Sequence, residues 1–189
     1  MDQLWRTTLW QQFGATIDML DNALVACPDA LWRERLWHNS PDHPLPADFP
    51  PEFAEFWYIA SHTLFWLDLY LSGVREEDFT PPAPFLWAEP GPSVSLARSY
   101  TKEELRAYLA SLRRKCHDTL VTLTDERARQ MVEYPWTQGQ TVSFQELQMY
   151  NMRHVHEHTA QLSLFLGQHG IPDEALDWVC RARAEEGGA

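Results

Sequence analysis

The sequence has few cysteines and little positive charge. Its three cysteines, at positions 27, 116 and 180, form no C-x-x-C pair and are odd in number. This pattern excludes a disulfide framework and a zinc ribbon, so we expect reduced thiols. The chain has 15 basic and 27 acidic residues, which give a formal net charge of −12. Because a nucleic-acid binder needs a positive surface to displace counterions from phosphates, we expect no nucleic-acid partner.

Long apolar runs are missing as well. A membrane span requires about 20 mostly apolar residues in succession. The best candidate, Phe56 to Leu71, is interrupted by Ser61, His62 and Asp68. The first residues also lack the charged segment and apolar core of a signal peptide. We therefore expect a cytoplasmic protein with no membrane partner.

The chain is long and apolar enough to fold around its own core. It has 189 residues, of which 44% are hydrophobic, and a chain of this length buries roughly 70% of the surface that its unfolded form exposes. No internal repeat or inter-domain linker is visible. We expect residues 1–189 to form a single domain.

Proline positions divide the sequence into segments. Six prolines lie between Cys27 and Glu52, and five more lie between Phe79 and Ser93. Because proline breaks the helical hydrogen-bond ladder, these stretches predict two long crossover connections between helices. Apolar residues recur three and four apart in the remaining segments, which indicates helices. The expected helices cover residues 4–26, 51–73, 101–120 and 143–167, with a shorter helix over 173–184 and an extended piece at 131–136.

Helix-end signals support these boundaries. Thr101 with Glu104, and Ser143 with Glu146, have the spacing of a capping box, in which side chains satisfy the free amides of a first turn. Gly73 suits the left-handed residue that follows a helix. The expected fold is an all-α four-helix bundle with long crossover loops. Candidate core side chains are those of Trp57, Trp66 and Cys116.

Three histidines lie on inward-facing helical positions. His154 and His158 are four residues apart on the fourth long helix, the spacing at which one helix offers two nitrogens to one metal ion. His62 stands in the apolar second helix, where an unpaired polar group costs about 1–3 kcal/mol. Either these rings are core histidines satisfied by hydrogen bonds, or they converge on a metal. Three imidazoles leave a coordination position open, as in catalytic sites, and they suit zinc, nickel or iron(II).

Other side chains are candidates for supporting roles near such a site. Loop tryptophans beside an open metal site can form the wall of a substrate pocket. These tryptophans are Trp37, Trp87 and Trp136. Polar groups that orient the ligands or the substrate are proposed from spacing alone. They are Tyr58, Asn151 and Gln161. A fourth ligand from Glu55, Asp68 or a loop stays open.

Two segments carry a resemblance to a known family. The stretch from Trp57 to Gly73 contains one histidine in WYIASHTLFWLDLYLSG, and the stretch from Arg153 to Leu162 reads RHVHEHTAQL. Together they resemble the DinB/YfiT-like metalloprotein superfamily of four-helix bundles, over roughly residues 4–170. The resemblance implies that His62, His154 and His158 bind a divalent ion, commonly zinc or nickel, often in a homodimer.

The resemblance also implies a class of reaction. Similar proteins include bacillithiol S-transferases and the mycothiol-dependent maleylpyruvate isomerase. In some relatives a glutamate replaces the first ligand of the pair, whereas this chain has His154, which argues against the isomerase substrate. The leading hypothesis is a metal-dependent thiol S-transferase acting on a small molecule with a low-molecular-weight thiol. The alternatives are a metal-dependent hydrolase and a non-catalytic metal-binding stress or sensor protein.

Overall fold

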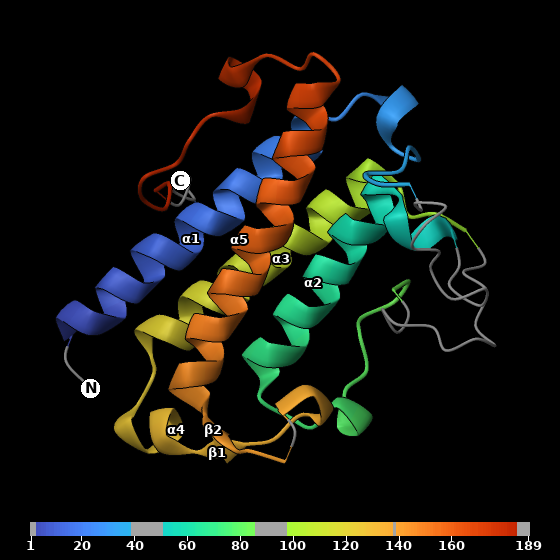
Figure 1. Ribbon diagram of the computed structural model, residues 1–189. Helices are drawn as coiled ribbons and strands as arrows, with labels where there is room; N and C mark the ends of the chain where they lie inside the picture. Colours follow the sequence, from blue (N-terminus) through green and yellow to red (C-terminus); the bar gives the residue numbers. More distant parts are fainter. Residues whose placement is uncertain (1–2, 39–50, 86–97, 138, 185–189) are drawn as a thin grey trace.

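The computed structural model describes residues 3–38, 51–85, 98–137 and 139–184. Four long helices pack side by side, with α1 and α5 running upward in Figure 1 and α2 and α3 running downward. Their bounds are α1 Gln3–Ala26, α2 Phe56–Ser72, α3 Lys102–Val121 and α5 Phe144–Gln168. The all-α four-helix bundle predicted from the sequence is confirmed.

Short elements connect and flank the bundle. The helix α4 (Asp125–Arg129) and a two-stranded antiparallel hairpin of β1 (Met131–Val132) and β2 (Val142–Ser143) link α3 to α5. The hairpin pairs Met131 with Ser143. The 3-10 helices are η1 Asp29–Leu31, η2 Pro51–Ala54, η3 Glu76–Asp78, η4 Pro135–Thr137 and η5 Asp173–Leu176. The expected extended piece at 131–136 is therefore only partly strand, and α4 was not predicted.

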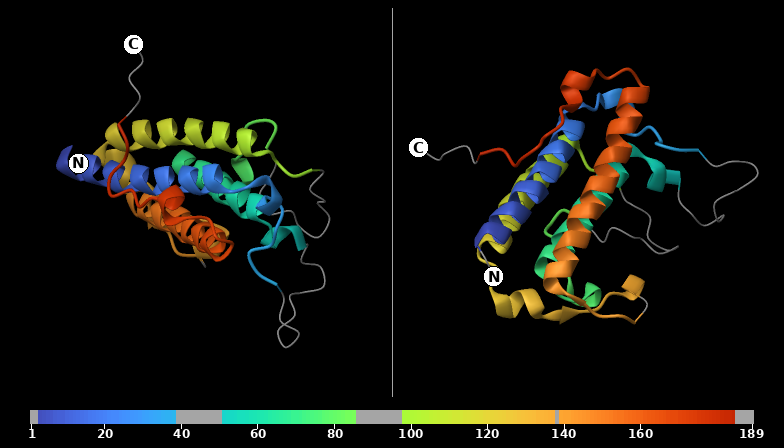
Figure 2. Two further views of the ribbon diagram at one scale, coloured as in Figure 1. Left: turned by 90° about the horizontal axis from the view of Figure 1, so that it is seen from above. Right: turned by 60° about the vertical axis from the view of Figure 1, so that its left-hand side comes forward.

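The four long helices form two layers. The right-hand view of Figure 2 shows α1 and α3 on one side and α5 with α2 on the other. Because α2 contacts both α3 and α5, most of its surface is buried, which explains why it is apolar on nearly every side. Trp57, Trp66 and Cys116 are 1%, 5% and 0% exposed, as expected for core side chains. Within the described ranges, no helix combines the length and apolar character that crossing a bilayer requires.

The predicted helix-end signals are largely confirmed. The Thr101 hydroxyl accepts a hydrogen bond from the Glu104 amide at 3.2 Å, and Glu104 Oε2 accepts from the Thr101 amide at 2.8 Å. The Ser143 hydroxyl accepts from the Glu146 amide at the start of α5. Gly73 closes α2 with φ 67°, in the left-handed region. A Cβ there would lie 2.7 Å from the Phe144 ring, so glycine is required for space as well as conformation.

The start of α2 differs from the prediction. We expected the helix to begin near Pro51, but the chain forms the short η2 and then an extended residue, Glu55, before α2 begins at Phe56. The backbone around Glu55 pairs with the segment after η1, because the Phe56 amide donates to the Glu34 carbonyl at 3.0 Å and the two segments form a bridge at Arg35. This long-range pairing replaces the first helical turn.

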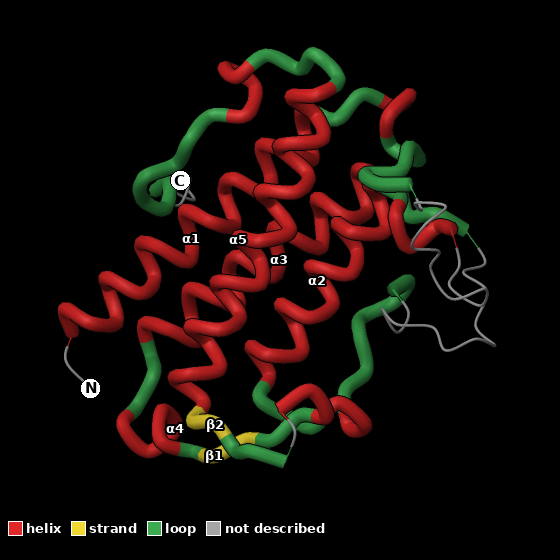
Figure 3. The backbone as a smooth tube through the Cα atoms, in the orientation of Figure 1, coloured by secondary structure: helices red, strands yellow, loops and turns green. Residues whose placement is uncertain are grey.

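The predicted helix over 173–184 is wrong. Only η5 forms, and residues 177–184 then cross α1 without regular structure, as the tube in Figure 3 shows. We call residues 177–184 the C-terminal strap. The Ala182 amide donates to the Gln11 carbonyl at 2.9 Å, and the Arg183 amide donates to Asp18 Oδ2 at 2.7 Å. A Cβ on Gly14 would lie 2.5 Å from the Cβ of Ala182, so this glycine lets the strap approach α1.

Candidate metal centre

The three predicted histidines converge between α2 and α5. His62 belongs to α2, and His154 and His158 lie one turn apart on α5. One ligand nitrogen from each lies within 4.8 Å of the others, and the Nε2 atoms of His154 and His158 are 3.1 Å apart. A tetrahedral zinc ion with bonds of about 2.0–2.1 Å separates two ligand atoms by roughly 3.3 Å. The spacing of the cluster therefore fits one divalent ion.

Helix packing sets this arrangement. Because α2 and α5 contact each other along their length, a histidine in the middle of α2 faces the middle of α5. The His62 ring lies 5.4 Å from the His154 ring and 5.0 Å from the His158 ring, measured between centroids. All three residues are partly buried. Only two elements are needed to bring the three rings together.

The surroundings keep two of the imidazoles, those of His62 and His154, uncharged. Burial and the nearby His158 lower the pKa of His62 from 6.5 to about 3. Burial, followed by His158 and His62, lowers the pKa of His154 from 6.5 to about 2. At neutral pH these rings are therefore unprotonated, which is the form that binds a metal ion.

Gln161 fixes the orientation of one ring. Its Oε1 atom lies 2.9 Å from Nδ1 of His158. An amide oxygen accepts hydrogen bonds, so this contact favours the tautomer of His158 that has its proton on Nδ1 and its Nε2 lone pair toward His154. The Nδ1 atom of His154 is buried and has no hydrogen-bond partner among the described residues. The Nε2 atoms of His154 and His158 therefore face each other, and one of these two imidazoles is held by a glutamine.

The other two polar candidates have different roles. Asn151 is fully buried and donates from Nδ2 to the Leu67 carbonyl at 3.3 Å, so it ties α5 to α2. Tyr58 stacks on Phe53 at 4.5 Å, and its ring lies 6.4 Å from that of His62. Its ring therefore borders the cluster.

The two carboxylates considered as a fourth ligand are engaged elsewhere. Asp68 accepts hydrogen bonds from the Tyr108 hydroxyl and from the Lys115 ammonium, both at 2.5 Å. Glu55 accepts from the Trp57 indole at 2.6 Å and pairs with Arg33 at 3.2 Å. Across the described ranges, the only group of three or more potential metal ligands is the histidine cluster itself. Those three residues could hold one metal ion, and the described residues offer no fourth ligand beside them.

Aromatic rings cover one side of the cluster. Trp136 stacks on Tyr150 with centroids 4.4 Å apart and an interplanar angle of 15°, and the Tyr150 ring lies 6.4 Å from that of His154. Tyr70 contacts both rings edge-on and lies 6.2 Å from His154. We call Tyr70, Trp136 and Tyr150 the aromatic wall. Trp136, one of the loop tryptophans singled out in the sequence, is thus near the cluster.

Of the other two loop tryptophans, only Trp37 lies in the part of the chain that the structure describes. Trp37 is 39% exposed, and no recorded ring contact joins it to a histidine of the cluster. Trp87 lies outside the described residues. Tyr70 was missed by sequence reasoning because it has the burial pattern of an ordinary core residue on α2. Only the packing of the loop after β1 against α2 reveals that it faces the site.

Comparison with known proteins agrees with this geometry. The profile of the DinB superfamily matches residues 12–162. The chain belongs to the DinB superfamily. The matched segment contains His62, His154 and His158. The comparisons with curated proteins and with solved structures gave no match, so substrate and metal have to be argued from the site of this DinB superfamily protein.

Proposed function

We propose that this DinB superfamily protein is a divalent-metal-dependent enzyme that transfers a low-molecular-weight thiol to a small electrophile. The observation that carries the proposal is the convergence of three imidazoles, two of them kept uncharged by burial, with no fourth ligand among the described residues. Structural zinc sites have four protein ligands, whereas catalytic sites keep a position for water or substrate. Zinc and nickel are the proposed metals, with iron(II) as a further option, because imidazole suits all three.

The chain supplies binding and orientation. A divalent ion in this site would act as a Lewis acid that lowers the pKa of a thiol. His62, His154 and His158 would hold the ion, and the Gln161 amide would keep the Nε2 atom of His158 directed at it. Trp136 and Tyr150 of the aromatic wall are partly exposed, and the Tyr150 ring lies 6.4 Å from that of His154, so these two rings offer an apolar surface on which an electrophile can stack.

The proposal is tested with metal-loaded protein, a set of small thiols and a chromogenic aryl halide. We expect thiol-dependent turnover that is lost in His158→Ala and retained in Gln168→Ala, an exposed position on the same helix. Turnover of esters without added thiol would instead indicate the hydrolase. Absence of both activities in protein that binds one ion per chain would favour the non-catalytic metal-binding protein.

Two further properties are proposed, of which the homodimer rests on the resemblance to the DinB/YfiT-like superfamily and the location rests on the sequence. We propose a homodimer located in the cytoplasm. Sedimentation at several protein concentrations tests the first property, and a mass of one chain at every concentration would contradict it. Fractionation of the producing cell tests the second.

A further inference from the structure

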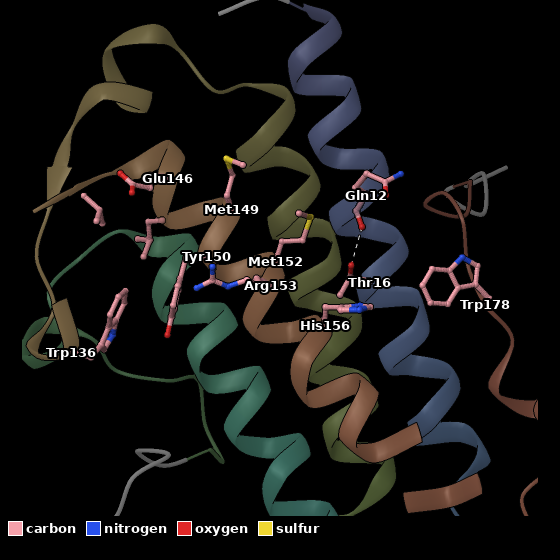
Figure 4. Close-up of a pocket in the computed structure, with 12 residues that line it drawn as sticks. Gln12, Thr16, Trp136, Glu146, Met149, Tyr150, Met152, Arg153, His156 and Trp178 are labelled. Carbon is pink, nitrogen blue, oxygen red and sulfur yellow. Dashed lines mark hydrogen bonds between the residues drawn. The ribbon is translucent and has the colours of Figure 1, made fainter. Parts of the chain in front are cut away.

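A second concave surface lies between α5 and α1, and at one end it shares Trp136 and Tyr150 with the aromatic wall beside the histidine cluster. It is a solvent-open groove of about 1000 Å³ between α5 and α1, and none of the three histidines of the cluster lines it. Figure 4 shows Met149 and Met152 between the two helices, with Trp178 of the C-terminal strap on the α1 side. Pockets for small organic ligands have volumes of about 300–1000 Å³. The groove is therefore large enough for such a ligand.

The apolar side of the groove is held in place but left exposed. The Asp177 carbonyl accepts from the Asn22 amide at 3.0 Å, and the Cys180 carbonyl accepts from the Gln12 amide at 3.2 Å. These bonds fix the backbone on both sides of Trp178, whose side chain is nevertheless 74% exposed. Met149 is 51% exposed across the groove. An anchored tryptophan and a methionine facing solvent form an apolar surface that remains available to a ligand.

The polar side of the groove has one uncompensated cation. The Arg153 guanidinium lies over the Tyr150 ring, 5.3 Å from its centroid. Within the described ranges it forms no ion pair, although the protein has a net charge of −12. Glu146 also lines the groove, but it is seven residues away on α5, about 10 Å along the helix axis. His156, edge-on to Trp178 at 6.4 Å, is the other titratable group that faces this space.

We propose that this groove binds an amphipathic organic anion. Its apolar body would lie on Met149, Met152 and Trp178, and its carboxylate or sulfonate would pair with Arg153. A guanidinium held by a cation–π contact beside exposed apolar side chains suits a ligand that has both a negative charge and an apolar body. The groove shares Trp136 and Tyr150 with the aromatic wall, but the anion would contact Met149, Met152, Trp178 and Arg153, so its binding requires neither a bound ion nor thiol transfer.

The test compares two fluorescent probes that share an apolar body. One probe, 8-anilinonaphthalene-1-sulfonate, carries a negative charge, and the other, N-phenyl-1-naphthylamine, lacks it. Each probe is titrated into wild-type protein and into the variants Arg153→Met, Trp178→Ala, Arg114→Met and His158→Ala. Arg114 is an exposed arginine on α3 that does not line the groove, so it controls for the loss of one positive charge. Equal thermal midpoints of the exposed-site variants establish that they fold.

The expected results separate the charge from the apolar surface. Arg153→Met should raise the Kd of the sulfonate by about fivefold, as expected for one partly exposed ion pair, and leave that of the uncharged probe unchanged. Trp178→Ala should weaken both probes, whereas Arg114→Met and His158→Ala should weaken neither. The proposal is overturned if the sulfonate shows no saturable binding, if Arg114→Met weakens it as much as Arg153→Met, or if His158→Ala removes it.

Discussion

Replacing Gln161 with leucine removes the hydrogen bond that orients one ligand of the proposed metal centre. Leucine has a similar size, so the helix and the packing of α5 are kept while the acceptor for His158 Nδ1 is lost. In the wild type this acceptor lies 2.9 Å from the ring nitrogen, and both side chains are partly buried. Without it, the imidazole can rotate or adopt the tautomer that places its proton on Nε2, where the ion would bind.

The size of the effect follows from the energy of one such bond. A neutral hydrogen bond contributes about 0.5–1.5 kcal/mol, which corresponds to roughly twofold to tenfold in a binding constant. Loss of ring orientation adds to this, and substitutions of groups that support metal ligands weaken metal binding by about 10–100-fold. We therefore expect Gln161→Leu to raise the Kd for zinc by about tenfold. Gln161→Glu keeps an acceptor and should bind at least as tightly as wild type.

The assay is competition for zinc between the protein and a chromophoric chelator at neutral pH. Gln168→Leu is the matched control, because Gln168 is an exposed glutamine at the end of the same helix. Its zinc affinity should equal that of wild type. If Gln161→Leu also binds zinc as tightly as wild type, the hydrogen bond between Gln161 and His158 does not orient the ring for metal binding.

Three further predictions concern stability. Burial and His158 lower the pKa of His62 to about 3 in the folded protein. Because the unfolded chain then binds more protons than the folded one, metal-free protein loses stability as the pH falls below about 6.5. Urea titrations at about pH 7.5 and pH 5 give the free energy of unfolding at each pH, and its decrease should be about 2 kcal/mol larger in wild type than in His62→Leu. An equal decrease in both proteins would contradict this prediction. Asp68→Ala should lower the free energy of unfolding by about 2 kcal/mol, because the buried Tyr108 hydroxyl loses its acceptor. An unchanged free energy of unfolding in urea titration would argue against a stabilising role for this hydrogen bond. Gly14→Ala should destabilise by about 1–3 kcal/mol through its clash with the C-terminal strap, whereas Gly167→Ala, which has open space around its Cβ position, should not. Equal thermal midpoints for these two variants would show that the C-terminal strap does not pack closely against Gly14.

Short sequence patterns were sufficient to predict the helix ends that depend only on neighbouring residues. The capping box of Thr101 and Glu104 forms as predicted at the start of α3, and Gly73 ends α2 in the left-handed conformation. The histidine cluster was also predictable, because spacing on α5 pairs His154 with His158 and only one further inward histidine was available on α2. Spacing likewise identified Gln161, which is three residues from its partner.

Long-range contacts explain what the sequence could not predict. The segment 177–184 has enough helix-forming residues for a short helix, yet its backbone bonds to α1 through Gln11 and Asp18. The start of α2 is displaced by pairing between Glu55 and the segment near Arg35. The sequence left Asp68 open as a fourth metal ligand, but its carboxylate faces α3 and pairs with Lys115 there. None of these partners is near in sequence.

Metal content per chain tests the central claim most directly. Tag-free protein would be analysed for zinc, nickel and iron, together with the variants His62→Ala and His154→Ala. We expect about one divalent ion per wild-type chain and none in either variant, because each substitution leaves only two histidines to hold the ion. Wild-type protein that contains no metal and gains none on titration would contradict the account, and the three histidines would then be ordinary core residues.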